Sequence, residues 1–172
     1  YQITNVGELQ SMIYGLDKNY IVMNSFSCDF APYNTGEGFL PVGGVPTWPP
    51  QAALIFSGTL DGQGHIISGL FIDRDTSDYI GLFGCINGSA NLSEIGLTDV
   101  NITGQLMVGG LVGLNYGGTI EYAFSTGMVT GGGDSLGSAT GGLVGRNDGT
   151  IRNSYSAADV IDGGNGTGGL TG

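Results

Sequence analysis

The amino-acid sequence predicts an all-β protein built as a right-handed parallel β-helix (solenoid) with a short N-terminal capping helix. A glycine-rich segment recurs along the second half of the chain, and short apolar segments separated by Gly, Asn and Asp lie between the copies. The chain has 172 residues, of which 40% are hydrophobic, so it can bury a real core. A repeat of roughly 30 residues cannot enclose a core alone, and neighbouring repeats must therefore stack.

The repeat is defined by a short glycine motif. The segment 109–113 recurs as 141–145 and again as 168–172, and a degenerate copy, 80–84, precedes the first full one. The spacing between successive copies is nearly constant. The last copy stops inside the motif, so we expect the last repeat to be incomplete. The residues expected to carry the repeat are Gly81, Leu82, Gly84, Gly110, Leu111, Gly113, Asn115, Gly142, Leu143, Gly145, Asn147 and Tyr155.

Positions after the motif follow nearly the same spacing. Asn115 matches Asn147 in step with the glycines, whereas Ile120, Phe124 and Val129 match Ile151, Tyr155 and Val160 after a deletion of one position. Each unit then holds about three short β segments and forms one turn of the solenoid, with equivalent apolar residues stacked inside. Propeller blades need a period of roughly 40 residues or more, and helical repeats need a 3.6-residue periodicity that is absent here.

The N-terminal third lacks the repeat. Apolar residues at helical spacing predict a helix over residues 5–16, with Asn5 as N-cap and Glu8 in the first turn. Strands are expected at 20–23, 39–42 and 54–56, and four prolines with Trp48 predict an exposed loop over 41–51. We therefore divide the chain into residues 1–53, the cap and first coils with a Pro-rich loop, and residues 54–172, the repeat β-helix.

Charge and hydropathy exclude two classes of partner. Fifteen acidic residues and four basic ones give a formal net charge of −11, so polyanions such as nucleic acids are repelled. No apolar run approaches the ~20 residues of a membrane helix, so no membrane insertion is expected here. The first residues lack the charged and apolar regions of a signal peptide, and the chain is expected to start inside a mature, larger protein.

Cysteine and histidine are too few for the usual metal or catalytic arrangements. Cys28 and Cys85 lie outside any CxxC pattern, which excludes a typical zinc site. A disulfide between them and two buried free thiols are equally compatible with the sequence. His65 is the sole histidine and lies in the segment 61–65, where Asp61 is expected to accept backbone N–H bonds in a tight turn.

Two groups of residues could bind a ligand. Asp73, Asp75 and Asp78 flank Arg74 between two apolar segments, where they could hold calcium or act as the carboxylates of a polysaccharide-cleaving β-helix. A solvated loop is the competing interpretation. Trp48 and Tyr33 could offer flat apolar faces to a sugar ring, against the competing interpretation that they pack on the coil.

The repeat also resembles a known family. The motif GGLVGxNxGxIxNSY, present as residues 141–155, is similar to the GLUG repeat of bacterial filamentous-haemagglutinin-like adhesins and of some IgA-specific metallopeptidases. Residues 56–67 are similar to the segment that leads into those repeats, so the resemblance covers residues 54–172. The first copy departs from the pattern at residues 121–124. The peptidase zinc motif HExxH is absent.

The resemblance implies a structural stalk or binding surface rather than an enzyme. We therefore expect a non-catalytic adhesin or stalk module, secreted or on the bacterial cell surface, which binds a host or environmental ligand such as a glycan or matrix protein. No cofactor is expected other than calcium at the acidic loop. The alternative is a carbohydrate-binding or polysaccharide-cleaving β-helix domain. An uncovered last coil also predicts end-to-end self-association.

Overall fold

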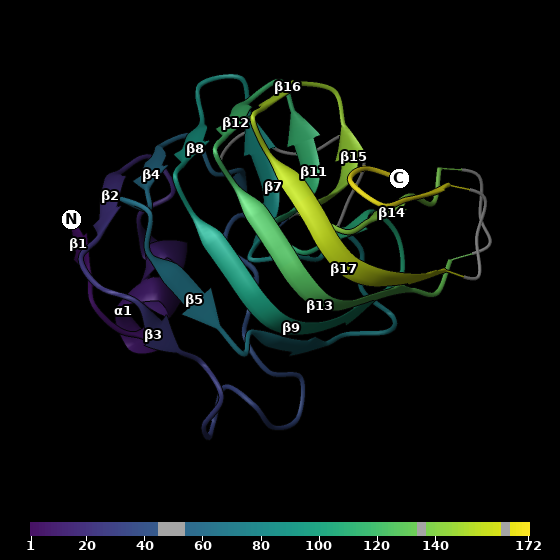
Figure 1. The fold of residues 1–172 in the computed structure, drawn as a ribbon, viewed down its shortest axis with the longest axis horizontal. Helices are drawn as coiled ribbons and strands as arrows, with labels where there is room; N and C mark the ends of the chain where they lie inside the picture. The colour runs from purple at the N-terminus through teal and green to yellow at the C-terminus, as the bar shows by residue number, and fades with distance from the viewer. Residues whose placement is uncertain (45–53, 134–136, 163–165) are drawn as a thin grey trace.

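Parallel strands wind around one axis and stack into four sheets, which we call sheets A to D (Figure 1). A computed structural model describes residues 1–44, 54–133, 137–162 and 166–172. Every pair of strands in these ranges is parallel, which confirms the predicted parallel β-solenoid. Parallel pairing of all strands requires each connection to cross over, which one turn of a solenoid supplies.

Sheets A and B form the two long walls. Sheet A contains β1 (Gln2–Ile3), β2 (Asn19–Val22), β4 (Thr59–Asp61), β8 (Asn91–Ser93), β12 (Thr119–Glu121) and β16 (Thr150–Arg152) in that spatial order. Sheet B contains β3 (Phe26–Ser27), β5 (Ile66–Ser68), β9 (Gly96–Gly104), β13 (Phe124–Gly131) and β17 (Tyr155–Asp162), and β6 (Phe71–Asp73) also pairs with β9. Spatial order follows chain order, as successive coils require.

Sheets C and D are shorter and close the coil. Sheet C contains β7 (Phe83–Asn87), β11 (Val112–Tyr116) and β15 (Val144–Asn147), and sheet D contains β10 (Val108–Gly109), β14 (Thr140–Gly141) and β18 (Thr167–Gly168). The glycine motif therefore spans the corner between sheets D and C in each coil.

The register confirms the repeat spacings. Gly109 pairs with Gly141 and Gly141 with Gly168, while Asn115 pairs with Asn147. The degenerate copy also stacks as expected, because Phe83 pairs with Val112. The matches after the one-position deletion are pairs in sheets A and B: Ile120 with Ile151, Phe124 with Tyr155, and Val129 with Val160.

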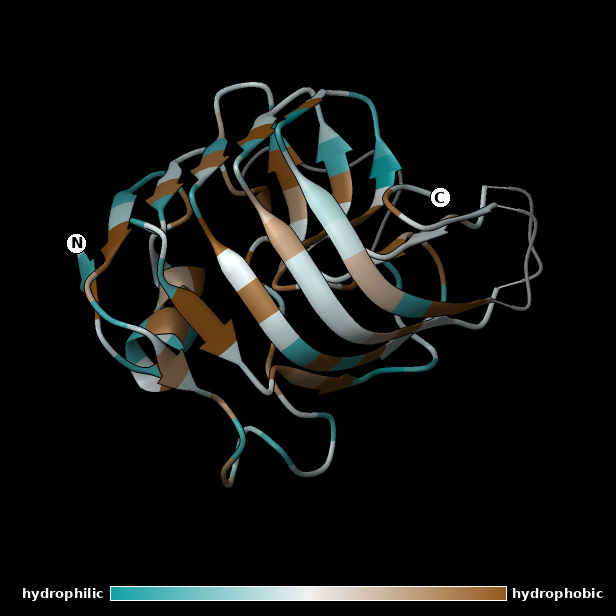
Figure 2. Ribbon diagram, in the orientation of Figure 1, coloured by the Kyte–Doolittle hydropathy of each residue, from teal (hydrophilic) through white to brown (hydrophobic). Residues whose placement is uncertain are grey.

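Ladders of equivalent apolar residues fill the interior. In sheet A the ladder is Tyr20, Leu60, Leu92, Ile120 and Ile151, of which the middle three are fully buried. Figure 2 shows hydrophobic and hydrophilic residues alternating along the strands, the period of two that turns one set inward. Each large side chain buried in this way contributes about 1.5–3 kcal/mol. Strands from both predicted parts, 1–53 and 54–172, share sheet A, and the boundary between those parts stays a prediction.

The glycine motif packs backbone against backbone between coils. A Cβ on Gly113 would lie 2.6 Å from the carbonyl carbon of Tyr79 and 2.7 Å from the oxygen of Gly84. A Cβ on Gly142 would overlap the hydroxyl of Ser156 and the carbonyl oxygen of Gly169. We call this corner, formed by Gly109, Gly110, Gly113, Gly141, Gly142 and Gly145, the glycine seam. The neighbouring coils leave no room for a Cβ at these positions, so the repeated glycines have a structural role.

A polar ladder runs beside the seam. Asn115 is fully buried, and its Nδ2 donates to the carbonyl oxygen of Gly118 at 3.1 Å and to Oδ1 of Asn147 at 2.7 Å. Asn147 in turn donates to the carbonyl oxygen of Gly149 at 3.2 Å. The repeated asparagine therefore fixes the turn after sheet C and links it to the next coil.

The N-terminal helix caps one end of the solenoid (Figure 1). It comprises α1 (Val6–Gln10) and a 3₁₀ segment, Ser11–Tyr14, and buries Val6, Leu9 and Met12. Asn5 is the N-cap, as predicted, since its side chain accepts from the Glu8 amide at 3.0 Å. The predicted extent to residue 16 is wrong because the chain leaves helical geometry at Gly15 (φ −146°), whose carbonyl accepts from the Tyr20 hydroxyl.

Two predicted strands near the Pro-rich segment are wrong. Residues 39–42 and 54–56 contribute only isolated bridges, from Val42 to Phe83 and from Phe56 to Ile86. Each segment still contributes fully buried side chains, since Phe39, Val42 and Phe56 have no exposed surface. Residues 45–53, which make up most of the predicted loop, lie outside the described ranges.

Both cysteines are free and buried, which settles the choice that the sequence left open. Cys28 belongs to the main core, whereas Cys85 lies in a second cluster with Ile55, Tyr79, Met107 and Leu114. Burial raises the pKa of each thiol to about 12, so both are protonated at neutral pH.

Candidate binding surface

The aromatic residues predicted to bind a sugar are not brought together. Trp48 lies outside the described residues. Tyr33 is half-buried against the core, and its ring meets that of Phe30 edge-on, with centroids 5.9 Å apart and planes at 86°. Packing therefore accounts for Tyr33, and its role in binding stays a prediction.

The acidic loop, residues 73–78, begins at the last residue of β6 and continues beside the end of β9, since the Arg74 amide donates to the Thr103 carbonyl oxygen. Asp73 and Asp75 are exposed, while Asp78 is half-buried. Arg74, between them, pairs with Glu37 instead, at 2.6 Å. Among the described residues, no three His, Cys, Asp or Glu side chains are grouped so as to hold a metal ion. Calcium binding at this loop stays a prediction.

A cavity of about 460 Å³ adjoins the end of the acidic loop. Ile13, Leu16 and Leu40 line it on the apolar side, and Arg74, Ser77 and Asp78 on the polar side. Nε of Arg74 and Oδ1 of Asp78 are buried without a hydrogen-bond partner in the described structure. Desolvation raises the pKa of Asp78 despite a backbone hydrogen bond from Leu106 that acts in the opposite direction.

The raised pKa of Asp78 predicts a specific pH dependence. The pKa of Asp78 is higher in the folded protein than in the unfolded chain, where it is near the ordinary value of 3.8. Between these two values the folded protein binds more protons than the unfolded chain. The contribution of Asp78 to the free energy of unfolding therefore falls as the pH rises above about 3.8. Asp78→Asn should remove that decline, as measured by urea unfolding between pH 3 and pH 7. Asp75→Asn, at an exposed position, is the matched control for removal of one carboxylate. A parallel decline in Asp78→Asn would contradict the assignment.

Exposed aromatic side chains gather where the chain turns from sheet A into sheet B. Gly96, Phe124 and Tyr155 occupy one register position in successive coils. The Phe124 and Tyr155 rings stack, with centroids 5.2 Å apart and planes at 4°. A Cβ on Gly96 would overlap the Phe124 ring, so the ring lies over this glycine. Tyr155 remains 57% exposed.

The same corner holds non-glycine residues in left-handed backbone conformation. Glu94, Tyr122 and Asn153 follow sheet A in three successive coils, with φ of 53°, 53° and 50°. Backbone hydrogen bonds tie two of them to the next coil: the amide of Glu94 donates to the carbonyl oxygen of Glu121, and the amide of Tyr122 to the carbonyl oxygen of Arg152. Asparagine tolerates this conformation, whereas for other residues it costs about 1–2 kcal/mol. Tyr122 and Glu94 therefore occupy strained positions, which are enriched at functional sites.

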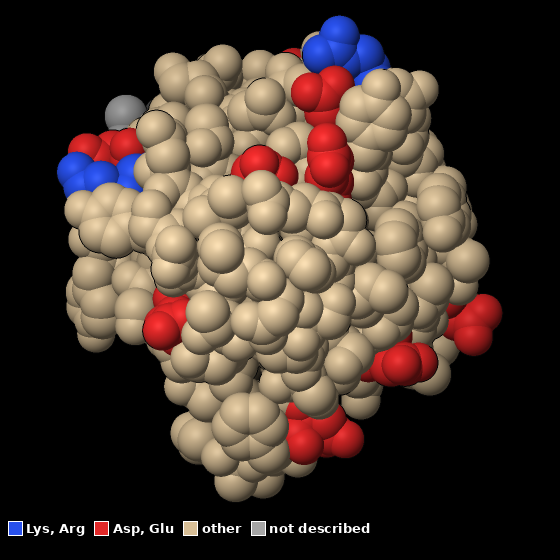
Figure 3. Space-filling view, turned by 60° about the vertical axis from the view of Figure 1, so that its left-hand side comes forward, with Lys and Arg blue, Asp and Glu red and all other residues tan. Residues whose placement is uncertain are grey.

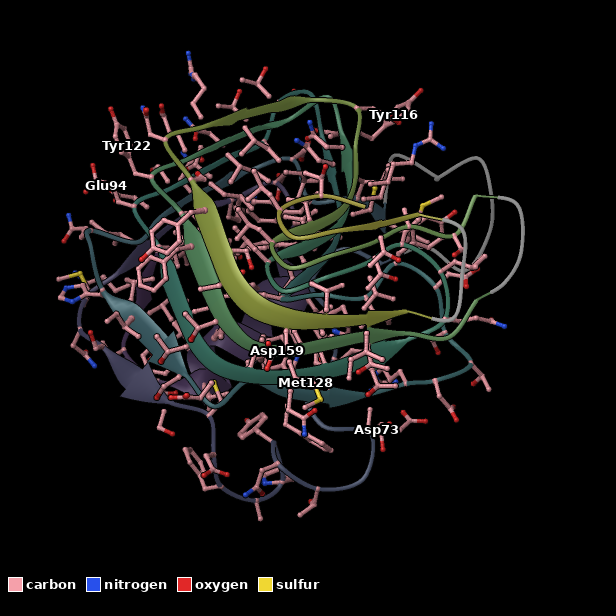
Figure 4. All side chains as sticks on the ribbon, turned by 45° about the vertical axis from the view of Figure 1, so that its right-hand side comes forward. Asp73, Glu94, Tyr116, Tyr122, Met128 and Asp159 are labelled. Atoms are coloured by element: carbon pink, nitrogen blue, oxygen red, sulfur yellow. The ribbon has the colours of Figure 1, made fainter. Side chains whose placement is uncertain are left out.

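A groove lies at this corner, and we call it the corner groove. It has a volume of about 300 Å³ and is lined by Gly64, Glu94, Ile95, Gly96, Tyr122 and Phe124. Figure 4 shows the side chains of Glu94 and Tyr122 projecting from this corner on the same side of the molecule. Tyr122 is 57% exposed. The groove thus combines aromatic surface with one carboxylate.

The charges around the corner groove restrict its ligands. Each of the four basic residues pairs with an acid, and the one at this corner, Arg152, pairs with Glu121 at 3.6 Å. Figure 3 shows acidic side chains scattered over a mostly uncharged surface. A carboxylate accepts hydrogen bonds from hydroxyl groups, and aromatic faces cover apolar ring faces. The groove therefore suits a neutral, hydroxyl-rich ring and disfavours a polyanion.

Sequence reasoning missed Glu94 and Tyr122 because no pattern reveals a left-handed φ at these residue types. One signal was available, since the equivalence of Phe124 and Tyr155 in the repeat implied that their rings would stack. The third aromatic contributor, Tyr122, breaks the repeat, as Asn153 occupies its place in the next coil.

Family comparison identifies the repeats. The model of the GLUG motif matches residues 104–130 and 137–161, the parts of the chain that form the last complete coils of the β-solenoid. Halomucin from Haloquadratum walsbyi is 38% identical over 113 residues, and a putative Gly-rich membrane protein from Evansella cellulosilytica is 34% identical over 136.

Both relatives are much longer than this chain. The matched residues cover 66% of the chain in each case, but only 1% of halomucin and 16% of the Gly-rich membrane protein. Neither bears the name of a haemagglutinin-like adhesin. No solved structure matches the chain. None of the described helices has the length and apolar character needed to cross a membrane.

Proposed function

We propose that this chain is a non-catalytic attachment module of a secreted or cell-surface protein, with the corner groove as its saccharide-binding site. The observation that carries the proposal is the groove itself, where Tyr122 and Glu94 occupy strained backbone positions beside the Phe124–Tyr155 stack. The GLUG motif and the surface-related names of the two relatives support the location. The stacked coils supply a stiff support that gains about 4.8 Å per coil.

A binding screen tests this function directly. The purified chain is applied to arrays of glycans and matrix proteins, with and without calcium, while the supernatant is analysed for cleaved saccharide. We expect retention of neutral glycans without cleavage products. Release of shortened saccharide would overturn the non-catalytic assignment in favour of a polysaccharide-cleaving domain. Retention by matrix proteins alone would overturn the saccharide assignment.

Tyr122→Asn separates binding from folding. Asparagine suits the left-handed φ of this position, as Asn153 does in the next coil, so the Tm should stay constant or rise. Loss of the ring should weaken glycan binding roughly three- to tenfold, the equivalent of about 0.5–1.5 kcal/mol of aromatic contact. Tyr116→Ala is the matched control, since Tyr116 is 52% exposed on β11 away from the groove (Figure 4). Equal affinities of wild type and Tyr122→Asn would place the site elsewhere.

We also propose that isolated modules associate end to end through the last coil. The outer edge of β17 pairs with no other described strand, and Ala158 of this strand packs against the core yet is only partly covered. Unpaired edges over apolar surface promote strand pairing between molecules. Ala158→Lys should shift sedimentation toward the monomer at micromolar concentrations, whereas Ala157→Lys, on the exposed face of the same strand, should not. Monomeric wild type at these concentrations would exclude the contact.

A further inference from the structure

A second set of surface residues carries an acceptor motif for covalent modification. The sequence Asn-X-Ser/Thr, with X other than proline, is the acceptor for asparagine-linked glycosylation. It occurs at Asn87, Asn91, Asn101 and Asn165. Asn165 lies outside the described residues. The other three differ sharply in geometry.

Two of the three described acceptors are engaged or covered. Oδ1 of Asn87 accepts from the Ser89 amide at 2.9 Å, which folds the motif into a tight turn. Asn91 is half-buried, and its Oδ1 is buried without a partner in the described structure. An attached sugar would displace both arrangements.

Asn101 has the accessible geometry. It lies in the middle of β9, where Val100 and Ile102 are 2% and 0% exposed and point into the core. Side chains alternate along a strand, so Asn101 and Thr103 share the outer face. Asn101 is exposed, and none of the described side-chain hydrogen bonds involves it. The amide and the hydroxyl of this motif therefore lie on the same outer face, where Asn101 is exposed and Thr103 is half-buried.

The neighbours of Asn101 would be covered by an attached sugar. Phe71 and Met128 flank Asn101 on the adjacent strands β6 and β13, and Met128 is 42% exposed. Figure 4 shows Met128 and Asp159 side by side on this face of sheet B. Met128 and Phe71 leave an apolar strip beside an acceptor amide, which the apolar face of a sugar ring can cover.

We propose that Asn101 is glycosylated on Nδ2 when the protein is exported. The co-reactant is a lipid-linked saccharide diphosphate, from which an oligosaccharyltransferase transfers the saccharide. The Nδ2–C1 bond forms, the C1–oxygen bond to the diphosphate breaks, and the proton lost from Nδ2 balances the released diphosphate. Export comes from the proposed function, but saccharide binding in the corner groove is independent of this modification.

The test uses the parent protein recovered from its source cells. A protease that cuts before aspartate releases residues 99–133, a peptide that contains the Asn101 motif and no other acceptor motif. Mass spectrometry should find this peptide heavier by a saccharide, with fragments that locate the sugar on Asn101. Asn101→Gln and Thr103→Val should abolish the added mass, whereas Thr103→Ser should retain it. Thr103→Val keeps a β-branched side chain, and melting of the purified variants checks their folding.

Cell fractionation separates the two proposals. An unmodified peptide from protein recovered at the cell surface overturns glycosylation and leaves the proposed function standing. An unmodified peptide from protein retained in the cytoplasm overturns both. Added mass that survives Thr103→Val also overturns the proposal, because the modification then ignores the acceptor motif.

Discussion

Gly113→Ala is expected to cost about 3 kcal/mol or more of folding free energy, the upper end of the cost of overpacking a core. The new Cβ would lie 2.6 Å from the carbonyl carbon of Tyr79, 2.7 Å from the Gly84 oxygen and 2.7 Å from the Ile80 nitrogen. All three are backbone atoms in paired segments, so the clash can be relieved only if two coils move apart. Rigid backbone neighbours therefore make this substitution more costly than the insertion of a methyl group among side chains.

Gly132→Ala provides the matched control for Gly113→Ala. A Cβ on Gly132 would lie 3.5 Å from the nearest atom, the oxygen of Gly104, which is an ordinary contact. Urea unfolding followed by circular dichroism should show a large loss for Gly113→Ala and a change within about 0.5 kcal/mol for Gly132→Ala. Equal midpoints for the two variants would refute the explanation of the motif as backbone packing.

Asn115→Asp is expected to be comparably severe at neutral pH. The carboxylate would replace a buried Nδ2 that donates to the Gly118 oxygen and to Oδ1 of Asn147, so it would face two acceptors without a donor. An uncompensated buried charge costs about 3–5 kcal/mol. The folded-state pKa of the new carboxyl should rise well above its ordinary value of about 3.9.

The pH dependence of Asn115→Asp has a defined sign. Because its folded-state pKa is raised, the folded variant binds more protons than the unfolded chain, and stability falls as the pH rises from about 4 toward 7. The urea midpoint should therefore recover at pH 4, where a protonated carboxyl can donate one hydrogen bond. Asn101→Asp, at an exposed position, should show no comparable change. A loss of stability independent of pH would show that shape, rather than charge, determines the cost.

The repeat coils could be predicted from the sequence because residues one repeat apart in the sequence are paired in neighbouring coils. The match between the two complete motifs becomes the pairing of Gly109 with Gly141, and the match after the one-position deletion becomes the pairing of Phe124 with Tyr155. Stacked coils place equivalent residues side by side, so alignment of the sequence with itself gives the register. The predicted GLUG resemblance follows from the same residues and is confirmed over 104–130 and 137–161.

The N-terminal part resisted prediction because apolar segments there are buried without pairing. Phe39, Val42 and Phe56 look like strand residues, yet they fill the interior from irregular backbone. The hydrophobic pattern of a short segment indicates that its side chains are buried, but it does not show whether its backbone pairs with another strand. The candidate site was not predicted for a different reason. The left-handed φ of Tyr122 depends on the position of the corner in the coil, which the sequence pattern does not give.

The residues that allow the coils to stack lie at a different corner of the coil from the residues that vary between coils. Equivalent positions of the seam hold the same residue in successive coils, as Gly109 and Gly141 do. The opposite corner holds Glu94, Tyr122 and Asn153 at one position, and Gly96, Phe124 and Tyr155 at another. A newly duplicated coil would inherit its means of stacking unchanged while its outer corner is free to vary. Specificity can then evolve coil by coil without any change to the scaffold that carries it.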